Sequence, residues 1–212
     1  MKYKYKFNID EDGLIHITDL PFKTRYVEVP REERFRKLYS YVLIRIDLIT
    51  AMKYLEVATT TTDPIIREGL FRIAVVLYAK CYSPAKHGGR SNIVEGKVYK
   101  DVQGEPIACH NKIRDMRSKY IAHDEDDFLD AQLGAVLDLD AKRLCGVAYI
   151  EKQAKFDYDN TIHILYTLCK ISLEKVEAEL DAETASIDEY LRKRDFDTIN
   201  SYPDMKIKYD TI

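Results

Sequence analysis

The chain has 212 residues, of which 46% are hydrophobic and 33% are charged, and its formal net charge at pH 7 is −3. This length can bury a core and suits one globular domain with additions. No apolar run approaches the roughly 20 residues of a membrane-spanning helix and no signal peptide is recognisable, so a cytoplasmic location without a membrane partner is expected. The pI near 6.0 differs from that of a free-standing nucleic-acid binder, so any RNA contact must come from a local patch.

Four cysteines lie far apart in the sequence: Cys81, Cys109, Cys145 and Cys169. They include no C-x-x-C pair, so they are expected to be buried as small hydrophobic side chains. A zinc site that combines Cys81 and Cys109 with His87 and His110 has spacings that match no zinc pattern. No metal or other cofactor is therefore expected.

The N-terminal segment has the pattern of a β-hairpin. Residues 2–9 alternate between polar and apolar side chains, which is the period of a half-buried strand. Asp10–Gly13 supplies turn-forming residues, and residues 14–18 can return as the second strand. Residues 1–30 are therefore predicted to form a hairpin extension that leads into a helical core.

Two long helices are predicted next. In residues 31–58 apolar side chains recur at steps of three and four, and the predicted buried residues are Phe35, Leu38, Val42, Ile46, Ile49 and Met52. Asp63 and Pro64 supply the cap and the first turn of a second helix that continues to about Tyr82. Its predicted buried residues are Ile66, Leu70, Ile73, Leu77 and Cys81. The short loop between the two helices predicts antiparallel packing.

The middle of the chain contains a basic loop and a third helix. Lys86–Arg90 is the loop, and residues 91–104 are polar with room for one or two short helical turns. Glu105 and Pro106 open the third helix, whose predicted apolar face is Ile113, Met116 and Tyr120. His110 and His163 lie in helical segments beside apolar neighbours and are expected to be structural.

The last third of the chain predicts a second hairpin and a fourth long helix. The hairpin covers residues 133–152, around a turn at Asp140–Arg143. Asp157 or Asp159 caps the helix, and its predicted buried residues are Ile162, Leu165, Leu168, Ile171, Leu173 and Val176. A separate charged helical piece at residues 187–195 and a peripheral tail follow.

The predicted fold is mainly α. It is a single domain over residues 1–212, with the N-terminal hairpin in residues 1–30 and a core of four to five helices in residues 31–184. The second hairpin is inserted before the last long helix, and residues 185–212 form a C-terminal helix and tail.

The third helix carries the segment that bears most on chemistry. Arg117 and His123 fit the pattern R-x(4–6)-H near the end of that helix. Together with the segment 113–124, the helix end Tyr78–Cys81 and the following Gly89–Arg90, this pattern resembles the HEPN superfamily, helical-bundle proteins of prokaryotes, over about residues 35–180. The resemblance implies a HEPN-like bundle that is a metal-independent endoribonuclease of the toxin or phage-defence type. It also implies an RNA substrate, a homodimer, and a cognate antitoxin or other partner protein.

The residue types suit this chemistry. A histidine that titrates near neutral pH can take the proton of a ribose 2′-hydroxyl, which then attacks the adjacent phosphate. An arginine can stabilise the charge that builds on the phosphate oxygens without a metal. By resemblance, His123 is the general base, Arg117 is the phosphate clamp, and the product ends in a 2′,3′-cyclic phosphate. The predicted substrate-binding residues are Arg90, Arg114, Ser118 and Lys119, with Ser118 orienting the catalytic pair.

Helix geometry limits how this pair can meet. Six residues at about 100° each leave Arg117 and His123 about 120° apart around the helix axis. The two side chains converge if the helix deforms at its end, if Arg117 reaches round, or if a second chain completes the site. The last possibility makes the homodimer part of the prediction.

The acidic run Asp124–Asp127 leaves other interpretations open. Its carboxylates would favour protonated His123, but they would also repel an RNA backbone. One alternative is that His123 caps the helix while the arginines pair with Asp115 or Asp124. The chain would then be a non-catalytic HEPN-like binding, scaffold or regulatory protein that forms a homodimer. A metal-dependent enzyme would require the acidic run to converge with acids of another helix.

Overall fold

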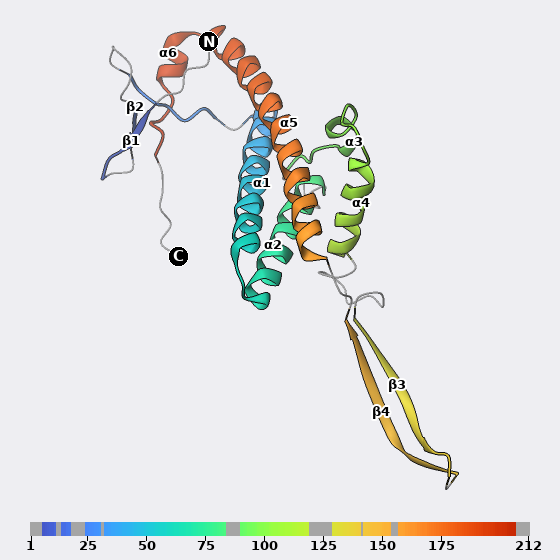
Figure 1. Cartoon of the computed structure of the whole chain (residues 1–212). Coiled ribbons are helices and arrows are strands. Elements are labelled where there is room, and N and C mark those ends of the chain that lie inside the picture. Colours follow the sequence, from blue (N-terminus) through green and yellow to red (C-terminus); the bar gives the residue numbers. More distant parts are fainter. Residues whose placement is uncertain are drawn as a thin grey trace. The chain divides into compact units, whose positions relative to one another are not determined.

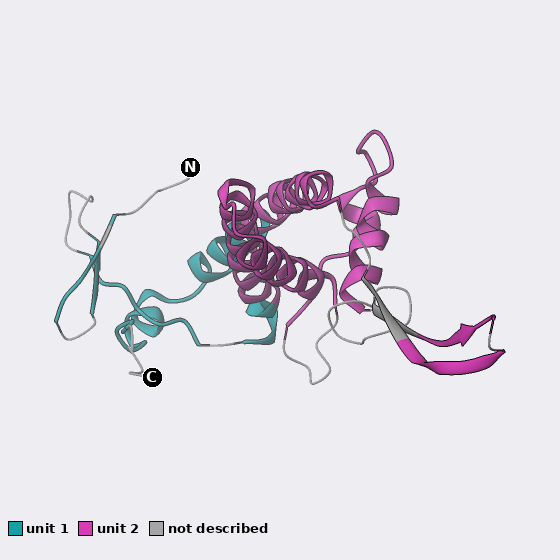
Figure 2. Cartoon of the chain, turned by 60° about the horizontal axis from the view of Figure 1, so that its bottom comes forward, with its two compact units in different colours: residues 1–36, 182–212 teal, residues 37–181 magenta. Residues whose placement is uncertain are grey.

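A computed structural model describes residues 6–11, 14–17, 24–30, 32–83, 90–118, 129–140, 142–153 and 157–206. The chain divides into two compact units, shown in Figure 2: a terminal unit of residues 1–36 and 182–212, and a helical unit of residues 37–181. A mainly α protein with two antiparallel hairpins is confirmed. The single domain and the specific HEPN-like bundle stay predictions.

The terminal unit contains the N-terminal hairpin. Strands β1 (Phe7–Ile9) and β2 (Ile15–Ile17) pair antiparallel, as predicted for this segment. Residues 24–30 lie along the C-terminal segment, where the Met205 amide donates to the Tyr26 carbonyl at 2.9 Å and the Glu28 amide donates to the Pro203 carbonyl at 2.8 Å. The short helix α6 (Phe196–Asn200) precedes this contact.

The helical unit is built on two long helices joined by a short loop. A 3-10 turn at Glu33–Phe35 precedes α1 (Arg36–Thr60), and α2 (Pro64–Tyr82) follows (Figure 1). As predicted, Asp63 caps α2, because its carboxylate accepts from the amides of Ile65 at 2.9 Å and Ile66 at 3.2 Å. Because Pro64 has no N–H, two of the three orphan amides at the helix start are thereby satisfied.

Three further helices follow. They are the short α3 (Glu95–Val98), α4 (Pro106–Met116) and the long α5 (Tyr158–Arg192). The Asp157 carboxylate accepts a hydrogen bond from the backbone amide of Asn160 at 3.2 Å. Asp157, rather than Asp159, is therefore the cap of α5. The separate helical piece predicted at residues 187–195 is wrong, since α5 continues to Arg192. Ion pairs one turn apart, such as Arg192–Asp188 at 2.9 Å, and the absence of Pro or Gly from residues 158–192 favour this continuation.

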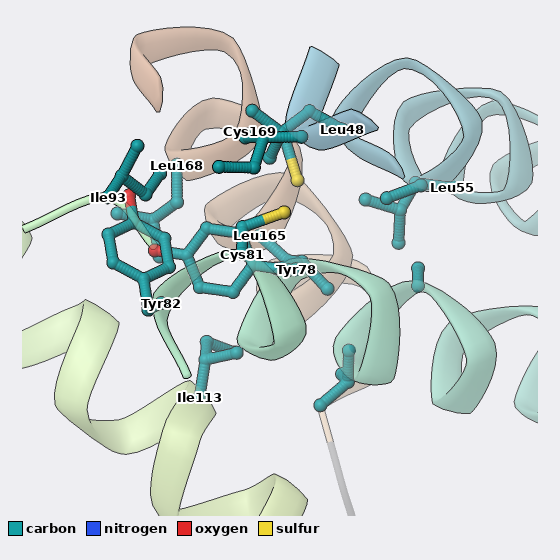
Figure 3. Packing of buried hydrophobic residues seen from close by; sticks show 14 of the residues in the cluster. Leu48, Leu55, Tyr78, Cys81, Tyr82, Ile93, Ile113, Leu165, Leu168 and Cys169 are labelled. Carbon is teal, nitrogen blue, oxygen red and sulfur yellow. The ribbon is translucent and has the colours of Figure 1, made fainter. Parts of the chain in front are cut away.

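The core of the helical unit combines side chains of α1, α2, α4 and α5 (Figure 3). The predicted buried side of α5 is confirmed, with Ile162, Leu165 and Val176 buried. The predicted side of α1 is wrong at Val42 and Ile46, which are 42% and 52% exposed, whereas Ile44 and Leu48 are fully buried. Apolar residues recur at steps of three and four on two opposite faces of α1, so spacing alone does not identify the core side.

In helix α2, too, the side that the apolar spacing predicts to be buried is partly exposed. Its predicted residues Ile66 and Ile73 are exposed, and Phe71, Val75 and Tyr78 are buried in their place. The core therefore uses the aromatic face of α2. An aliphatic face is left at the surface.

The second hairpin is confirmed and is longer than predicted. Strands β3 (Leu129–Asp138) and β4 (Arg143–Gln153) pair antiparallel, with an irregularity in register between Val136 and Leu137. Several large apolar side chains of this hairpin are exposed: Leu133, Val136, Leu137, Leu144 and Val147. Within the described ranges, every helix is too short or too polar to cross a bilayer.

Candidate functional site

The candidate site lies at the end of α4. Gly104 has a φ of 92°, a conformation that other residues rarely adopt, and Pro106 then occupies the first turn of the helix. His110, Ile113 and Met116 are buried, so the predicted apolar face is confirmed at Ile113 and Met116. Tyr120, its third predicted member, lies outside the described residues. The face anchors α4 to the core, and Arg117 and Ser118, just past the end of the helix, are exposed.

The two arginines of α4 lie on neighbouring positions of this last turn. Arg114 and Arg117 are three residues apart, which places them about 60° from each other around the helix axis. Arg114 is half-buried, and Arg117 and Ser118 are exposed. No carboxylate within the described ranges forms an ion pair with either arginine. Their positive charges therefore lack a described counter-charge, apart from the negative end of the helix dipole.

The helix changes its winding at Arg117. Arg117 and Ser118 form a wider π-type turn after the regular helix ends at Met116. Such turns redirect the side chains that follow them and are frequent at functional sites. His123 and Lys119 lie outside the described residues, so their predicted roles stay predictions.

Arg90 lies in a different environment from the α4 arginines. Its side chain is 15% exposed and forms an ion pair with Asp47 of α1, which also binds Lys80 at 3.3 Å. A second guanidinium nitrogen lies 3.8 Å from the Cys81 sulfur. The predicted RNA contact by Arg90 stays a prediction, and it now requires this buried ion pair to open.

A buried polar network that the sequence interpretation missed fixes α4 to the core. The Tyr78 hydroxyl lies 2.7 Å from Nδ1 of His110 and 2.6 Å from the Tyr99 hydroxyl. The Tyr82 hydroxyl lies 2.9 Å from that of Tyr99 and 2.6 Å from Oγ of Ser172. These contacts join α4, α2, the segment after α3, and α5. The signal was present in Tyr78 and Tyr82, whose spacing of four places both hydroxyls on one face of α2.

Burial keeps this network neutral. It lowers the pKa of His110 to about 4, with the charge of Arg114 acting in the same direction and Glu95 opposing. Burial also raises the pKa values of Tyr78 and Tyr82 well above their usual range. At pH 7 all three groups are uncharged, so His110 acts as a structural residue, as predicted. Its Nε2 atom is buried and has no hydrogen-bond partner among the described residues.

The four cysteines have three kinds of surroundings, and Cys109 of α4 is half-buried. The expected burial is confirmed for Cys81 and Cys169 and is wrong for Cys145, which is exposed in β4. Burial raises the pKa of the Cys81 thiol to about 12, so this thiol is protonated at neutral pH. Within the described residues, no group of three or more His, Cys, Asp or Glu side chains is arranged to hold a metal ion.

Comparison with protein-family models, with curated proteins and with solved structures found no match to the chain. The resemblance to the HEPN superfamily therefore stays a prediction. What the described geometry offers is an exposed, positively charged helix end that can receive an anion such as a phosphate group.

Proposed function

We propose that this chain is a HEPN-like protein that cleaves RNA without a metal, in the manner of a toxin or phage-defence ribonuclease. The observation that supports this proposal is the pair Arg114 and Arg117, two guanidinium groups at one helix end without an ion-pair partner among the described carboxylates. An arginine committed to a structural ion pair, as Arg90 is to Asp47, serves this role less well.

In the proposed reaction, Arg117 binds the phosphate oxygens and stabilises the charge that develops on them. His123 removes the proton of the 2′-hydroxyl, and the 2′-oxygen attacks the phosphorus. The bond between phosphorus and the 5′-oxygen breaks, and the 5′-oxygen takes up a proton from water. Arg114 and Ser118 contact the adjacent backbone, with Lys119 and Arg90 as further contacts. The products are a 2′,3′-cyclic phosphate and a 5′-hydroxyl end.

We further propose a homodimer, supported by the outer face of α1. Four large apolar side chains form a patch on this face, opposite the core, at 39% to 52% exposure: Tyr39, Val42, Leu43 and Ile46. Val57, at 51%, lies further along the same face, beyond the exposed Lys53. Contiguous exposed apolar surface is typical of protein interfaces. When a two-fold axis runs perpendicular to a helix, the apolar face of that helix packs against the same face of the second copy. A second copy of this chain would therefore cover the patch with its own.

The test compares wild type with His123→Ala and Arg117→Ala on a mixed-sequence RNA in the presence of a chelator. Wild type is expected to produce 2′,3′-cyclic phosphate ends. Each variant is expected to be slower by a factor of about 10² or more. His16→Ala and Arg143→Ala, at exposed positions of the two hairpins, are matched controls and should keep full activity. Intact RNA after incubation with folded, dimeric wild type would reject the proposal.

A second candidate is a non-catalytic binding, scaffold or regulatory protein with the same dimer. The exposed apolar residues of the β3–β4 hairpin favour it, because Leu133, Leu137 and Leu144 offer a surface for a partner protein such as an antitoxin. The same assay separates the two candidates. A folded dimer that binds RNA or a partner without cutting RNA supports the binding protein.

A further inference from the structure

A half-open surface cavity of about 400 Å³ lies between the last turn of α1 and the first turns of α5, within the helical unit. Glu56, Thr59 and Thr60 are exposed at its rim, and Ile162 is buried. Its lining residues are Glu56, Thr59, Thr60, Asp159, Ile162, His163 and Tyr166. The volume falls in the range of small-molecule sites. His163, expected to be structural, is exposed here. None of these residues belongs to the proposed ribonuclease site.

The hydroxyl groups that line this cavity already donate hydrogen bonds to other atoms of the protein. Thr59 donates to the Leu55 carbonyl at 2.8 Å and Thr60 donates to the Val57 carbonyl at 3.1 Å. The Tyr166 hydroxyl donates to Oε1 of Glu56 at 3.0 Å. A hydroxyl group that already donates its hydrogen can act toward a ligand only as a hydrogen-bond acceptor. Apart from His163, the polar side chains of the lining therefore present hydrogen-bond acceptors.

The charge of the cavity is negative. Of its two carboxylates, Asp159 forms an ion pair with Arg67, whereas Glu56 has no basic partner within the described part of the chain. The two helix dipoles oppose each other here, because the C-terminal end of α1 brings partial negative charge and the N-terminal end of α5 brings partial positive charge. The charge that favours a cation is therefore that of the Glu56 carboxylate. One carboxylate without a counter-charge matches a ligand with one positive charge.

The remaining surfaces suit a short hydrocarbon chain. Ile162 is 4% exposed and supplies an apolar wall, and Tyr166 supplies an aromatic ring that can face a cation. A divalent metal fits less well, because hard cations require several converging oxygen ligands and the described residues form no cluster of three metal-binding side chains.

We propose that this cavity binds a small primary alkylammonium ion. Its three N–H groups match the free oxygen of Glu56 and the hydroxyl oxygens of Thr59 and Thr60, and its carbon chain lies against Ile162 and Tyr166. The interaction is charge-assisted, so the ammonium group rather than the hydrocarbon determines affinity. This binding is independent of RNA cleavage.

The test is an NMR titration of the full chain with n-butylammonium chloride, with n-butanol as the uncharged probe of the same length. The ammonium ion is expected to shift the Thr59, Thr60 and Tyr166 amide signals in a saturable way. Butanol should bind at least about tenfold more weakly, which corresponds to about 1.4 kcal/mol. Equal binding of the two probes, or no saturable shift with the ammonium ion, overturns the proposal.

Glu56→Gln removes the charge but keeps an oxygen that can accept from Tyr166. It should weaken n-butylammonium binding by about tenfold or more while preserving the spectrum of the folded chain. Glu174→Gln, an exposed change further along α5, is the matched control and should bind as wild type does. Unchanged affinity in folded Glu56→Gln also overturns the proposal.

Discussion

At the scale of single residues, His110 is a buried titratable group whose pKa lies within the range of ordinary solution experiments. Its Nδ1 atom joins the tyrosine network and its side chain is fully buried. Burial lowers its pKa from 6.5 to about 4, so the folded protein takes up this proton at a lower pH than the unfolded chain does. Between pH 6.5 and about pH 4, the unfolded state binds more protons at this residue than the folded state does. The free energy of unfolding therefore falls as the pH falls through this range.

We expect His110 to account for a loss of up to about 3 kcal/mol in the free energy of unfolding between pH 7 and pH 4. Urea denaturation of wild type and His110→Gln at several pH values measures it. Because glutamine does not titrate, the variant should lose less stability on acidification. The exposed His163→Gln is the control and should follow wild type. Parallel pH profiles for wild type and His110→Gln would contradict the expectation.

At the scale of elements, the boundary between α1 and α2 is fixed locally. Thr61–Asp63 separates the helices, Asp63 caps α2 and Pro64 occupies its first turn. The cap uses one carboxylate oxygen for two amides, and nothing distant in the chain is needed for it. This local character is the reason that the sequence predicts the start of α2 correctly.

Asp63→Ala is expected to lower the free energy of unfolding by about 1 kcal/mol, because the Ile65 and Ile66 amides lose their acceptor. Urea denaturation monitored by circular dichroism gives the value. Asp63→Asn keeps an oxygen acceptor and should recover most of the loss, and the exposed neighbour Thr62→Ala should behave as wild type. A loss of similar size in Thr62→Ala would indicate a general effect of the loop.

At the scale of the whole molecule, α1 has more apolar surface than one core can bury. Ile44, Leu48 and Leu55 face the core, and Val42 and Ile46 remain exposed on the opposite side. A helix with apolar side chains on two opposite faces is ordinarily covered on both faces. A second copy of the chain would supply the missing cover, consistent with the proposed homodimer.

The double variant Val42→Lys and Ile46→Lys is expected to convert the proposed dimer to a monomer, because it would place charges in the proposed apolar interface. Sedimentation velocity over a range of concentrations measures the change, and circular dichroism should show an unchanged helical content. Ile65→Lys is the control: Ile65 is 82% exposed in the first turn of α2, outside the α1 patch, and this variant should remain dimeric. A monomeric wild type would reject the homodimer.

The candidate site was predictable in part. The sequence identifies α4 and the apolar residues Ile113 and Met116 that hold it, so the position of Arg114 and Arg117 at the end of that helix follows from local pattern. The ion pair of Arg90 with Asp47 was not predictable, because the two residues are brought together by the packing of α1 against the end of α2. The tyrosine network also depends on four segments that are distant in sequence.

The sequence by itself determined the elements. Caps, turn residues and side-chain periodicity act over a few residues, and they predict the two hairpins, the capped start of α2 and the buried side of α5. Only the tertiary structure decided which apolar face of α1 and of α2 enters the core. Both faces satisfy the helical period equally well, and the choice depends on which one fits the side chains of α4 and α5.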